Sequence, residues 1–176
     1  MRTGLFVGRF QPFHNGHLAS ARYSLEKVDR LVIVVGSAQK SHEWRNPFTA
    51  GERISMIKAS LDAEEGFDWR RLLLIPVPDI DVHNLWVSYL DLFVPKYDVV
   101  FTNDPLTKLL FQERGKLVDE PALISRKDLS ATEVRRRITS DESWQELVPE
   151  QVVDFIRQLD GEHRIKSLSN TGHMGH

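Results

Sequence analysis

Short apolar runs alternate along this chain with longer stretches in which apolar residues recur at helical spacing. The runs are rich in β-branched and aromatic residues, and such continuous runs are typical of strands buried on both faces of a parallel sheet. A βαβ alternation of this kind predicts an α/β fold with an open, mostly parallel sheet flanked by helices. The four predicted strands are Leu5–Val7, Leu31–Val35, Leu72–Val77 and Asp98–Thr102.

Local signals predict where several helices begin. Thr49 and Ser130 each stand three residues before a glutamate, which is the capping-box pattern. Asn84 suits the N-cap of the next helix, and Asp104 or Asn103 suits the N-cap before Pro105.

The C-terminal part of the chain contains a predicted loop, an amphipathic stretch and a final polar stretch. Residues 150–159 predict a closing helix, and residues 119–129 predict a loop. Residues 167–176 are small and polar, and we expect them to form a flexible tail. The expected organisation is one domain over residues 1–166 followed by this tail.

Composition narrows the class of protein. The chain has 176 residues, of which 41% are hydrophobic and 27% are charged, as in ordinary globular domains. A net charge of −2 gives no basic surplus for nucleic acid or an anionic membrane, and no apolar run is long enough to span a bilayer. The absence of cysteine excludes disulfides and thiolate chemistry. A cytoplasmic enzyme or binding protein fits these features.

The stretch from Gly8 to His17, GRFQPFHNGH, carries the clearest chemistry. It joins a predicted strand to a helix start, where backbone N–H groups and the helix dipole favour an anion. Gly8 permits close backbone approach, Arg9 adds a cation, and His14 and His17 share one helix face. The junction predicts a phosphate-binding site. The two histidines alone are equally compatible with ordinary partly exposed side chains, and a zinc pair is disfavoured because metal-binding helices more often use His-Glu-x-x-His.

Two further segments offer phosphate-binding groups. The second predicted strand leads into a small-residue loop with Gly36 and Ser37. Ser130 and Thr132 place hydroxyl groups at a helix start, with Arg135 in the first turns, which suits a polyphosphate. A run of three arginines there is also compatible with a solvated face or a nucleic-acid patch. Arg45 taken alone is typical of a solvated side chain, and Trp86 of core packing.

The ordered set of motifs resembles one enzyme family. GRFQPFHNGH resembles the His-x-Gly-His signature of the nucleotidylyltransferase superfamily. Further along the chain come Gly36–Gln39, RNPFTAGER at 45–53, Ile75–Val77, Asp79-Ile80, Asn84–Trp86 and Ala131–Arg137. Together these closely resemble archaeal-type nicotinamide-nucleotide adenylyltransferases over residues 2–167. That resemblance implies a Rossmann-like fold and transfer of AMP from ATP to nicotinamide mononucleotide (NMN), giving NAD and pyrophosphate.

The resemblance also implies roles for individual residues. It places His14, His17 and Arg45 at the reacting phosphates, with His17 nearest the reacting centre, and it places Trp86 on the nicotinamide ring. The expected ATP-binding residues are Gly8, Arg9, Phe10, Gln11, Gly16, Asn103, Ser130, Thr132, Val134 and Arg135. The expected NMN-binding residues are Gly36, Ser37, Asp79, Asn84 and Trp86.

Other expectations follow from the same resemblance. Mg²⁺ is expected on the triphosphate with no dedicated protein metal site, and the protein is expected to form a homo-oligomer such as a hexamer. One alternative is a sister transferase that uses phosphopantetheine, flavin mononucleotide (FMN) or CTP, and Asn84 with Trp86 argues against it. The other is a non-catalytic nucleotide-binding module, which the intact histidine pair argues against.

Overall fold

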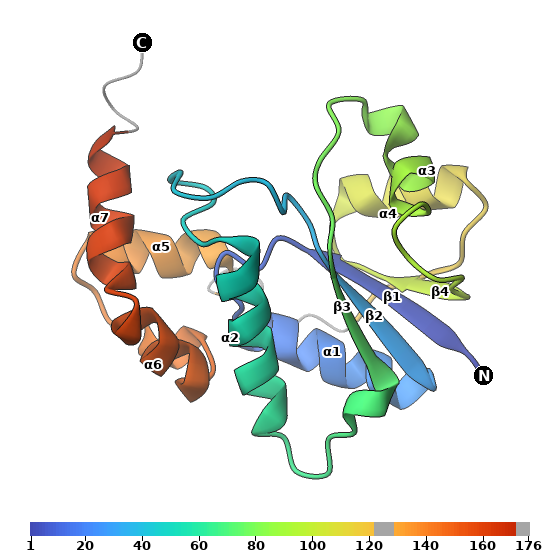
Figure 1. Ribbon diagram of the computed structural model, residues 1–176, viewed down its shortest axis with the longest axis horizontal. Helices are drawn as coiled ribbons and strands as arrows, with labels where there is room; N and C mark the ends of the chain where they lie inside the picture. The colour runs from blue at the N-terminus through green and yellow to red at the C-terminus, as the bar shows by residue number, and fades with distance from the viewer. Residues whose placement is uncertain (122–128, 172–176) are drawn as a thin grey trace. The chain divides into compact units, whose positions relative to one another are not determined.

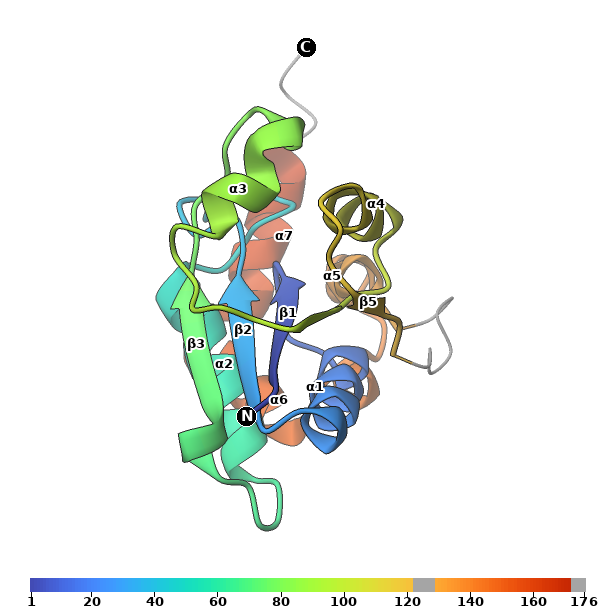
Figure 2. The same cartoon turned by 90° about the vertical axis from the view of Figure 1, so that its right-hand side faces the viewer.

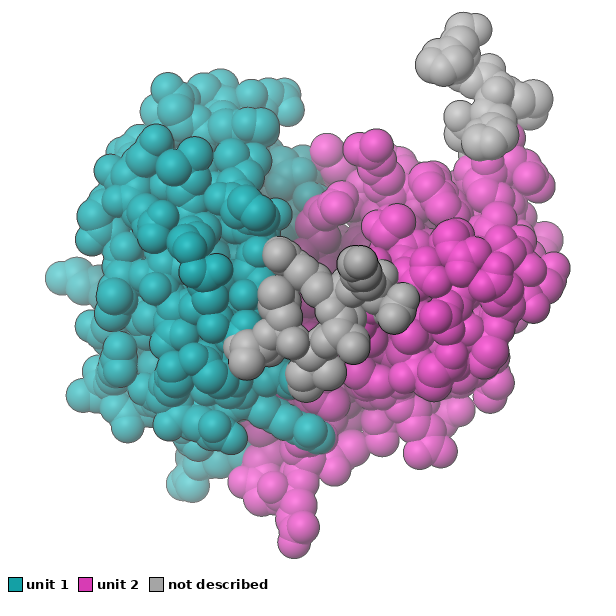
Figure 3. Space-filling view, turned by 180° about the vertical axis from the view of Figure 1, so that it is seen from behind, with its two compact units in different colours: residues 1–8, 19–39, 68–123 teal, residues 9–18, 40–67, 124–176 magenta. Residues whose placement is uncertain are grey.

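Parallel strands arranged in the order β3-β2-β1-β4-β5 form the sheet of this protein in the computed structural model, which describes residues 1–121 and 129–171 (Figures 1 and 2). The chain between Gly8 and Ala19 and the chain between Gln39 and Asp68 belong to a second compact unit. Unit 1 comprises residues 1–8, 19–39 and 68–123, and unit 2 comprises residues 9–18, 40–67 and 124–176 (Figure 3). The strands are β1 (Thr3–Gly8), β2 (Arg30–Val35), β3 (Leu72–Pro76), β4 (Val99–Phe101) and β5 (Val118–Asp119).

All strand pairs in this sheet are parallel, and the order reverses at β1. The chain runs outward from β1 through β2 to β3, and then returns to the other side of β1 with β4. In open α/β sheets, ligands bind beyond the carboxyl ends of the strands at such a switch point. Gly8, the last residue of β1, pairs with Val35, the last residue of β2, and therefore lies at this edge of the sheet.

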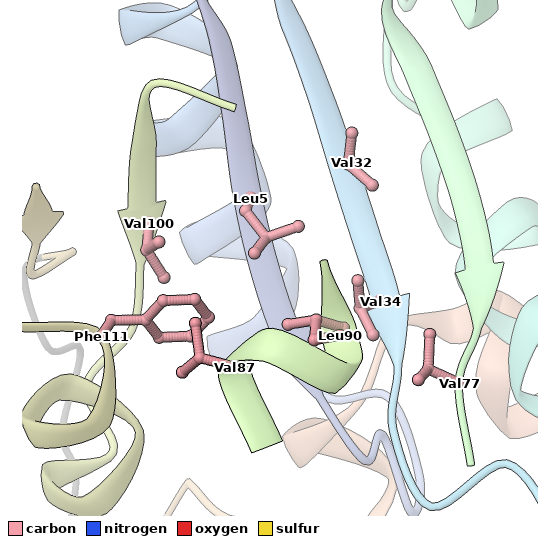
Figure 4. Close-up of a cluster of buried hydrophobic side chains, with 8 residues drawn as sticks. All are labelled: Leu5, Val32, Val34, Val77, Val87, Leu90, Val100 and Phe111. Carbon is pink, nitrogen blue, oxygen red and sulfur yellow. The ribbon is translucent and has the colours of Figure 1, made fainter. Parts of the chain in front are cut away.

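The sheet is held by apolar side chains on both faces. Leu5, Val34 and Val100 face α3 (Trp86–Leu90), whose Val87 and Leu90 pack onto them together with Phe111 of α4 (Pro105–Glu113) (Figure 4). Successive residues of a strand point to opposite faces, and Phe101 accordingly contacts Tyr23 of α1 (Asn15–Lys27) on the other side. Each fully buried side chain of this kind contributes about 1.5–3 kcal/mol.

Unit 2 is helical. It contains α2 (Ala50–Asp62), α5 (Ala131–Thr139), α6 (Glu150–Gln158) and α7 (Gly161–Thr171). Helix α6 packs against both α2 and α7, and α7 packs against α5. None of the helices in the described part of the chain is long and apolar enough to cross a membrane.

Most predicted elements are confirmed. The four predicted strands correspond to β1–β4, and the α/β sheet is all parallel. Thr49 forms both halves of its capping box, and Asp104 caps α4 with Pro105 at its first position. Ser130 caps α5 by accepting from the Glu133 N–H, while the Glu133 carboxylate pairs instead with two arginines of the same helix.

Three predictions about local structure are wrong. Asn84 is not an N-cap, because it lies in the 3₁₀ turn His83–Leu85 and α3 begins at Trp86. Asp119 is not in a loop, because it belongs to β5 and pairs there with Phe101 of β4. This strand is too short to produce a recognisable hydrophobic pattern in the sequence.

The predicted tail also begins too early. Helix α7 continues through Thr171, because Ile165 is fully buried and anchors it. Residues 172–176 of the predicted tail and residues 122–128 of the predicted loop lie outside the described residues.

Candidate active site

The loop after β1 brings His14 and His17 into direct ring contact. Their centroids are 3.5 Å apart and their planes differ by 23°. The Nδ1 atom of His14 accepts the backbone N–H groups of Gly16 and His17, at 3.1 and 3.3 Å. The His14 imidazole is therefore the N-cap of α1. The helix amides that we predicted to meet an anion already have this partner.

This hydrogen-bond pattern assigns the protonation of both rings. The His14 N–H donates to Nδ1 of His17 at 3.2 Å, so Nδ1 is an acceptor in each imidazole. In a neutral ring the proton then lies on Nε2. Burial lowers the pKa of His14 to about 4. Burial and the nearby His14 lower the pKa of His17 well below its usual value. Both histidines are thus neutral Nε2–H donors at neutral pH.

Phenylalanines and a glycine hold the histidine pair in place. The His17 ring stacks on Phe13 at 5.6 Å and meets the edge of Phe10 at 4.8 Å. Phe10 is buried and has a φ of 54°, a left-handed conformation that is costly for a bulky residue and often found at functional sites. A Cβ atom at Gly16 would stand 3.0 Å from Cε1 of His14. Glycine at this position therefore leaves room for the ring.

Arg135 is a buried cation that lacks a carboxylate partner among the described residues. Only 3% of it is exposed. Its Nη1 donates to the carbonyl of Gln11 at 2.7 Å and its Nη2 to Oγ1 of Thr132 at 3.3 Å, while Nε is buried without a partner. Burial lowers its pKa to about 10, and the positive charges of Arg9 and Arg45 act in the same direction. A buried, unneutralised guanidinium is costly unless an anion binds to it.

The loop after β1 and the segment that precedes α2 contribute more polar groups to unit 2. Arg9 of the loop and Arg45 of the segment are exposed and, within the described chain, form no ion pair. The Trp44 ring lies over Arg135, with its centroid 5.7 Å from Cζ. Asn46 is buried and its Oδ1 has no hydrogen-bond partner in the described structure. Three cations and an unsatisfied acceptor thus belong to one compact unit.

Two predicted nucleotide ligands, Gln11 and Val134, also take part in the internal packing of unit 2. The Gln11 side chain is buried and bridges the backbone of Phe48, donating to its carbonyl and accepting its N–H, both at 2.9 Å. The Val134 side chain is fully buried in the core. Ser130 accepts the Glu133 N–H at 3.1 Å as the cap of α5, and the exposed Thr132 accepts from Arg135.

The predicted NMN-binding residues belong to unit 1, and four site residues meet at the carboxyl edge of the sheet. The Gly36 N–H donates to the Gly8 carbonyl at 2.9 Å, and the Ser37 N–H donates to Oδ1 of Asp79 at 3.2 Å. Ser37 has a φ of 48°, which places it in the left-handed region. The loop after β2 is therefore hydrogen-bonded both to the last residue of β1 and to the loop after β3.

Asn84, Trp86 and Asn103 are positioned by other parts of unit 1. The Asn84 carbonyl accepts from Nη2 of Arg114 at 2.6 Å, and Asn84 itself is exposed. Trp86 is half-buried and meets the edge of Phe111 at 5.7 Å, so part of its ring serves the core. Asn103 directly follows β4 and is half-buried. The sequence did not predict a role for Trp44 or Arg114. Trp44 contacts Arg135 and Arg114 contacts Asn84, and both of these partners are distant in the chain.

Comparison with known proteins identifies the family. The family model described as Cytidylyltransferase-like matches residues 5–137. A relative from Thermococcus sibiricus is 48% identical over 168 residues, covering 94% of this chain and 89% of the relative. One from Saccharolobus solfataricus is 44% identical over 171 residues, covering 97% and 99%. Both are named nicotinamide-nucleotide adenylyltransferase. This chain belongs to that family.

Nicotinamide-nucleotide adenylyltransferases are nucleotidyltransferases, so the expected enzyme class is confirmed. The fold agrees with a solved structure of a bifunctional NMN adenylyltransferase/ADP ribose pyrophosphatase from Francisella tularensis, complexed with AMP and a manganese ion. The TM-score is 0.79 at 21% identity, covering 97% of this chain and 53% of that one. The present chain thus spans about half of the bifunctional protein. The roles of individual site residues stay predictions.

Proposed function

We propose that this protein transfers AMP from ATP to nicotinamide mononucleotide, forming NAD and pyrophosphate in NAD biosynthesis. The observation that carries the proposal is Arg135, a buried guanidinium with no carboxylate partner in the described chain, in the same unit as Arg9 and Arg45. Such a cluster binds a polyphosphate through charge-assisted hydrogen bonds. The family's named activity supplies the class of substrates.

The reaction needs no protein nucleophile. A phosphate oxygen of NMN attacks the α-phosphorus of ATP, a new P–O bond forms, and the bond from that phosphorus to the bridging oxygen breaks. Pyrophosphate leaves with the electron pair, and two phosphoryl groups become the diphosphate of NAD. Catalysis then consists of positioning the two reactants and stabilising negative charge on the transferred and leaving phosphates.

The histidine pair contributes hydrogen bonds to this charge. Because Nδ1 of His14 and Nδ1 of His17 both accept backbone N–H groups, each ring offers an Nε2–H donor. Their depressed pKa values keep them neutral. Arg9, Arg45 and Arg135 supply the positive charge for the phosphates, and the histidines act as oriented dipoles that do not need to be protonated.

We expect Mg²⁺ to enter with ATP. The described residues contain no cluster of three or more His, Cys, Asp or Glu side chains that would hold a metal ion. We assign no step of the reaction to a metal ion. We also propose a cytoplasmic homo-oligomer, on the basis of the family resemblance and a sequence without cysteine.

Incubation with alternative substrates tests the activity. The protein is supplied with ATP or CTP, with Mg²⁺, and with NMN, nicotinate mononucleotide, phosphopantetheine or FMN, and products are identified by mass. We expect NAD and pyrophosphate from ATP and NMN. A dominant product from phosphopantetheine, FMN or CTP would assign a sister transferase. The absence of turnover with tight nucleotide binding would indicate a binding module.

A further inference from the structure

The segment from Trp44 to Thr49 carries Arg45 and has little regular structure of its own. It lies between a loop and the start of α2, and apart from an isolated backbone bridge between Glu43 and Asn46 it is outside helices and strands. An irregular segment depends on side chains from elsewhere to keep one conformation. We therefore asked which side chains hold it.

One anchor comes from the loop after β1. The Gln11 amide forms two hydrogen bonds with the backbone of Phe48, at 2.9 Å each. This pairing places Phe48, three residues after Arg45, next to the loop that carries the histidine pair. Phe48 is fully buried, so it is a stable point of attachment.

A second anchor comes from α7. Arg164 donates to both carboxylate oxygens of Glu52, at 2.7 and 3.1 Å, and to the carbonyl of Pro47 at 3.3 Å. Its Cζ lies 5.9 Å from the centroid of the Phe48 ring. Only 21% of the Arg164 side chain and 18% of the Glu52 side chain are exposed. A bidentate arginine–carboxylate pair of this kind is directional as well as strong.

Glu52 connects Arg164 to the start of α2. Its carboxylate also accepts the Thr49 N–H at 2.9 Å, as the second half of the capping box. Burial opposes ionisation of this carboxylate, but the hydrogen bonds from Arg164 and from the Thr49 N–H outweigh burial and lower the pKa of Glu52. The Arg164 guanidinium thus contacts Pro47 and Phe48 directly and is connected to Thr49 through Glu52.

We infer that Arg164 is a positioning residue for Arg45. It touches no proposed substrate group and acts by fixing the backbone that follows Arg45. The inference rests on the proposed function, in which Arg45 binds a phosphate. Nothing near residue 164 in the sequence indicates this role, because its partners are more than a hundred residues away.

Kinetics of matched variants test the inference. Arg164→Met keeps the aliphatic stem near Phe48 and removes the guanidinium. Lys166→Met is the control, since Lys166 is on the same helix and pairs with the exposed Asp141. We expect Arg164→Met to lower kcat/KM by about 10- to 100-fold, the range for a misplaced substrate-positioning group. Arg164→Lys should recover part of this loss, and Lys166→Met should have no effect.

A double-mutant cycle separates positioning from general stability. In an Arg45→Ala background, Arg164→Met should lower kcat/KM by less than about threefold more, because the residue through which it acts is gone. Trypsin gives a readout without substrate: cleavage after Arg45 should accelerate relative to cleavage after Lys40. If Arg164→Met does not fold, Glu52→Gln weakens the same pair and should shift both readouts in the same direction.

The outcomes are distinct. Full activity of Arg45→Ala would reject the proposed phosphate role of Arg45, and the positioning inference with it. An impaired Arg45→Ala combined with a full, multiplicative effect of Arg164→Met would reject positioning alone. Equal activity of Arg164→Met and Lys166→Met would also reject it.

Discussion

The imidazole rings of His14 and His17 stack with their centroids 3.5 Å apart, while each Nδ1 accepts a backbone N–H from the same turn. The proton of each neutral ring therefore lies on Nε2, in a fixed orientation. We predict that His17→Ala lowers turnover by about 10²–10³, the typical cost of losing one preorganised donor. Steady-state kinetics with ATP and NMN measure this. Turnover within a fewfold of wild type, in a variant with unchanged thermal unfolding, would limit His17 to a structural role.

The buried His14 also predicts how stability depends on pH. Its folded pKa, about 4, is below the unfolded value of 6.5. The unfolded chain therefore binds more protons between these values, and the free energy of unfolding falls as pH decreases through this window. We expect a loss of roughly 1–2 kcal/mol from His14 between pH 6.5 and 5, before carboxylates titrate. Urea unfolding measures it.

His14→Asn supplies the comparison for this pH effect. Asparagine is a good N-cap but does not titrate, so the variant should lose less stability across the window. His163→Gln is the matched control because His163 is exposed, and it should follow wild type. Parallel curves for wild type and His14→Asn would contradict the assignment of His14 as a buried neutral ring.

Gly16→Ala tests the space around the histidine pair. The added Cβ would stand 3.0 Å from Cε1 and 3.1 Å from Nδ1 of His14, so the ring must move. We expect turnover to fall by on the order of tenfold or more. Gly51→Ala in α2 is the control, since its nearest neighbour is Oγ1 of Thr49 at 4.0 Å, and it should keep activity and gain about 0.4–1 kcal/mol of stability. Equal activity of the two variants would show that the ring tolerates displacement.

Arg135→Lys tests the phosphate cluster. Lysine keeps the charge but loses the planar fork, and a hydrogen bond to a charged group contributes roughly 1.5–3 kcal/mol. ATP binding should weaken by roughly 10- to 150-fold in isothermal titration. Arg136→Lys is the control, because Arg136 is exposed and pairs with Glu133 and Glu142 on the surface. Unchanged ATP affinity in Arg135→Lys would reject its assignment as a phosphate ligand.

Trp86→Ala tests the nicotinamide site. Stacking of a cationic ring on tryptophan contributes about 0.5–2 kcal/mol, so NMN binding should weaken roughly 2- to 30-fold while ATP binding stays unchanged. Trp86→Phe keeps an aromatic face and should be mild. Because Trp86 also packs on Phe111, Tyr89→Ala is the control for lost packing around the same core. Equal weakening of both ligands by Trp86→Ala would reduce Trp86 to a core residue.

The sequence by itself determined the features that depend on near neighbours in the chain. The apolar runs are visible in the residue types themselves, and they predicted the strands β1 to β4. Helix caps at Thr49, Asp104 and Ser130 involve partners three residues away; Thr49 and Ser130 were predicted, and Asp104 was one of two predicted candidates. The junction at Gly8–His17 was also found, because its strand end, histidine spacing and helix start are all local.

Only the tertiary structure decided which groups are buried and which distant partners they meet. Arg135 became the central cation because its guanidinium reaches the Gln11 carbonyl 124 positions away, far from solvent. The Gln11 amide is hydrogen-bonded to the backbone of Phe48. The polar end of the chain is part of α7, because Ile165 is buried and Arg164 pairs with Glu52. Burial and long-range hydrogen bonding depend on which surfaces meet when the chain folds, and no local pattern encodes that.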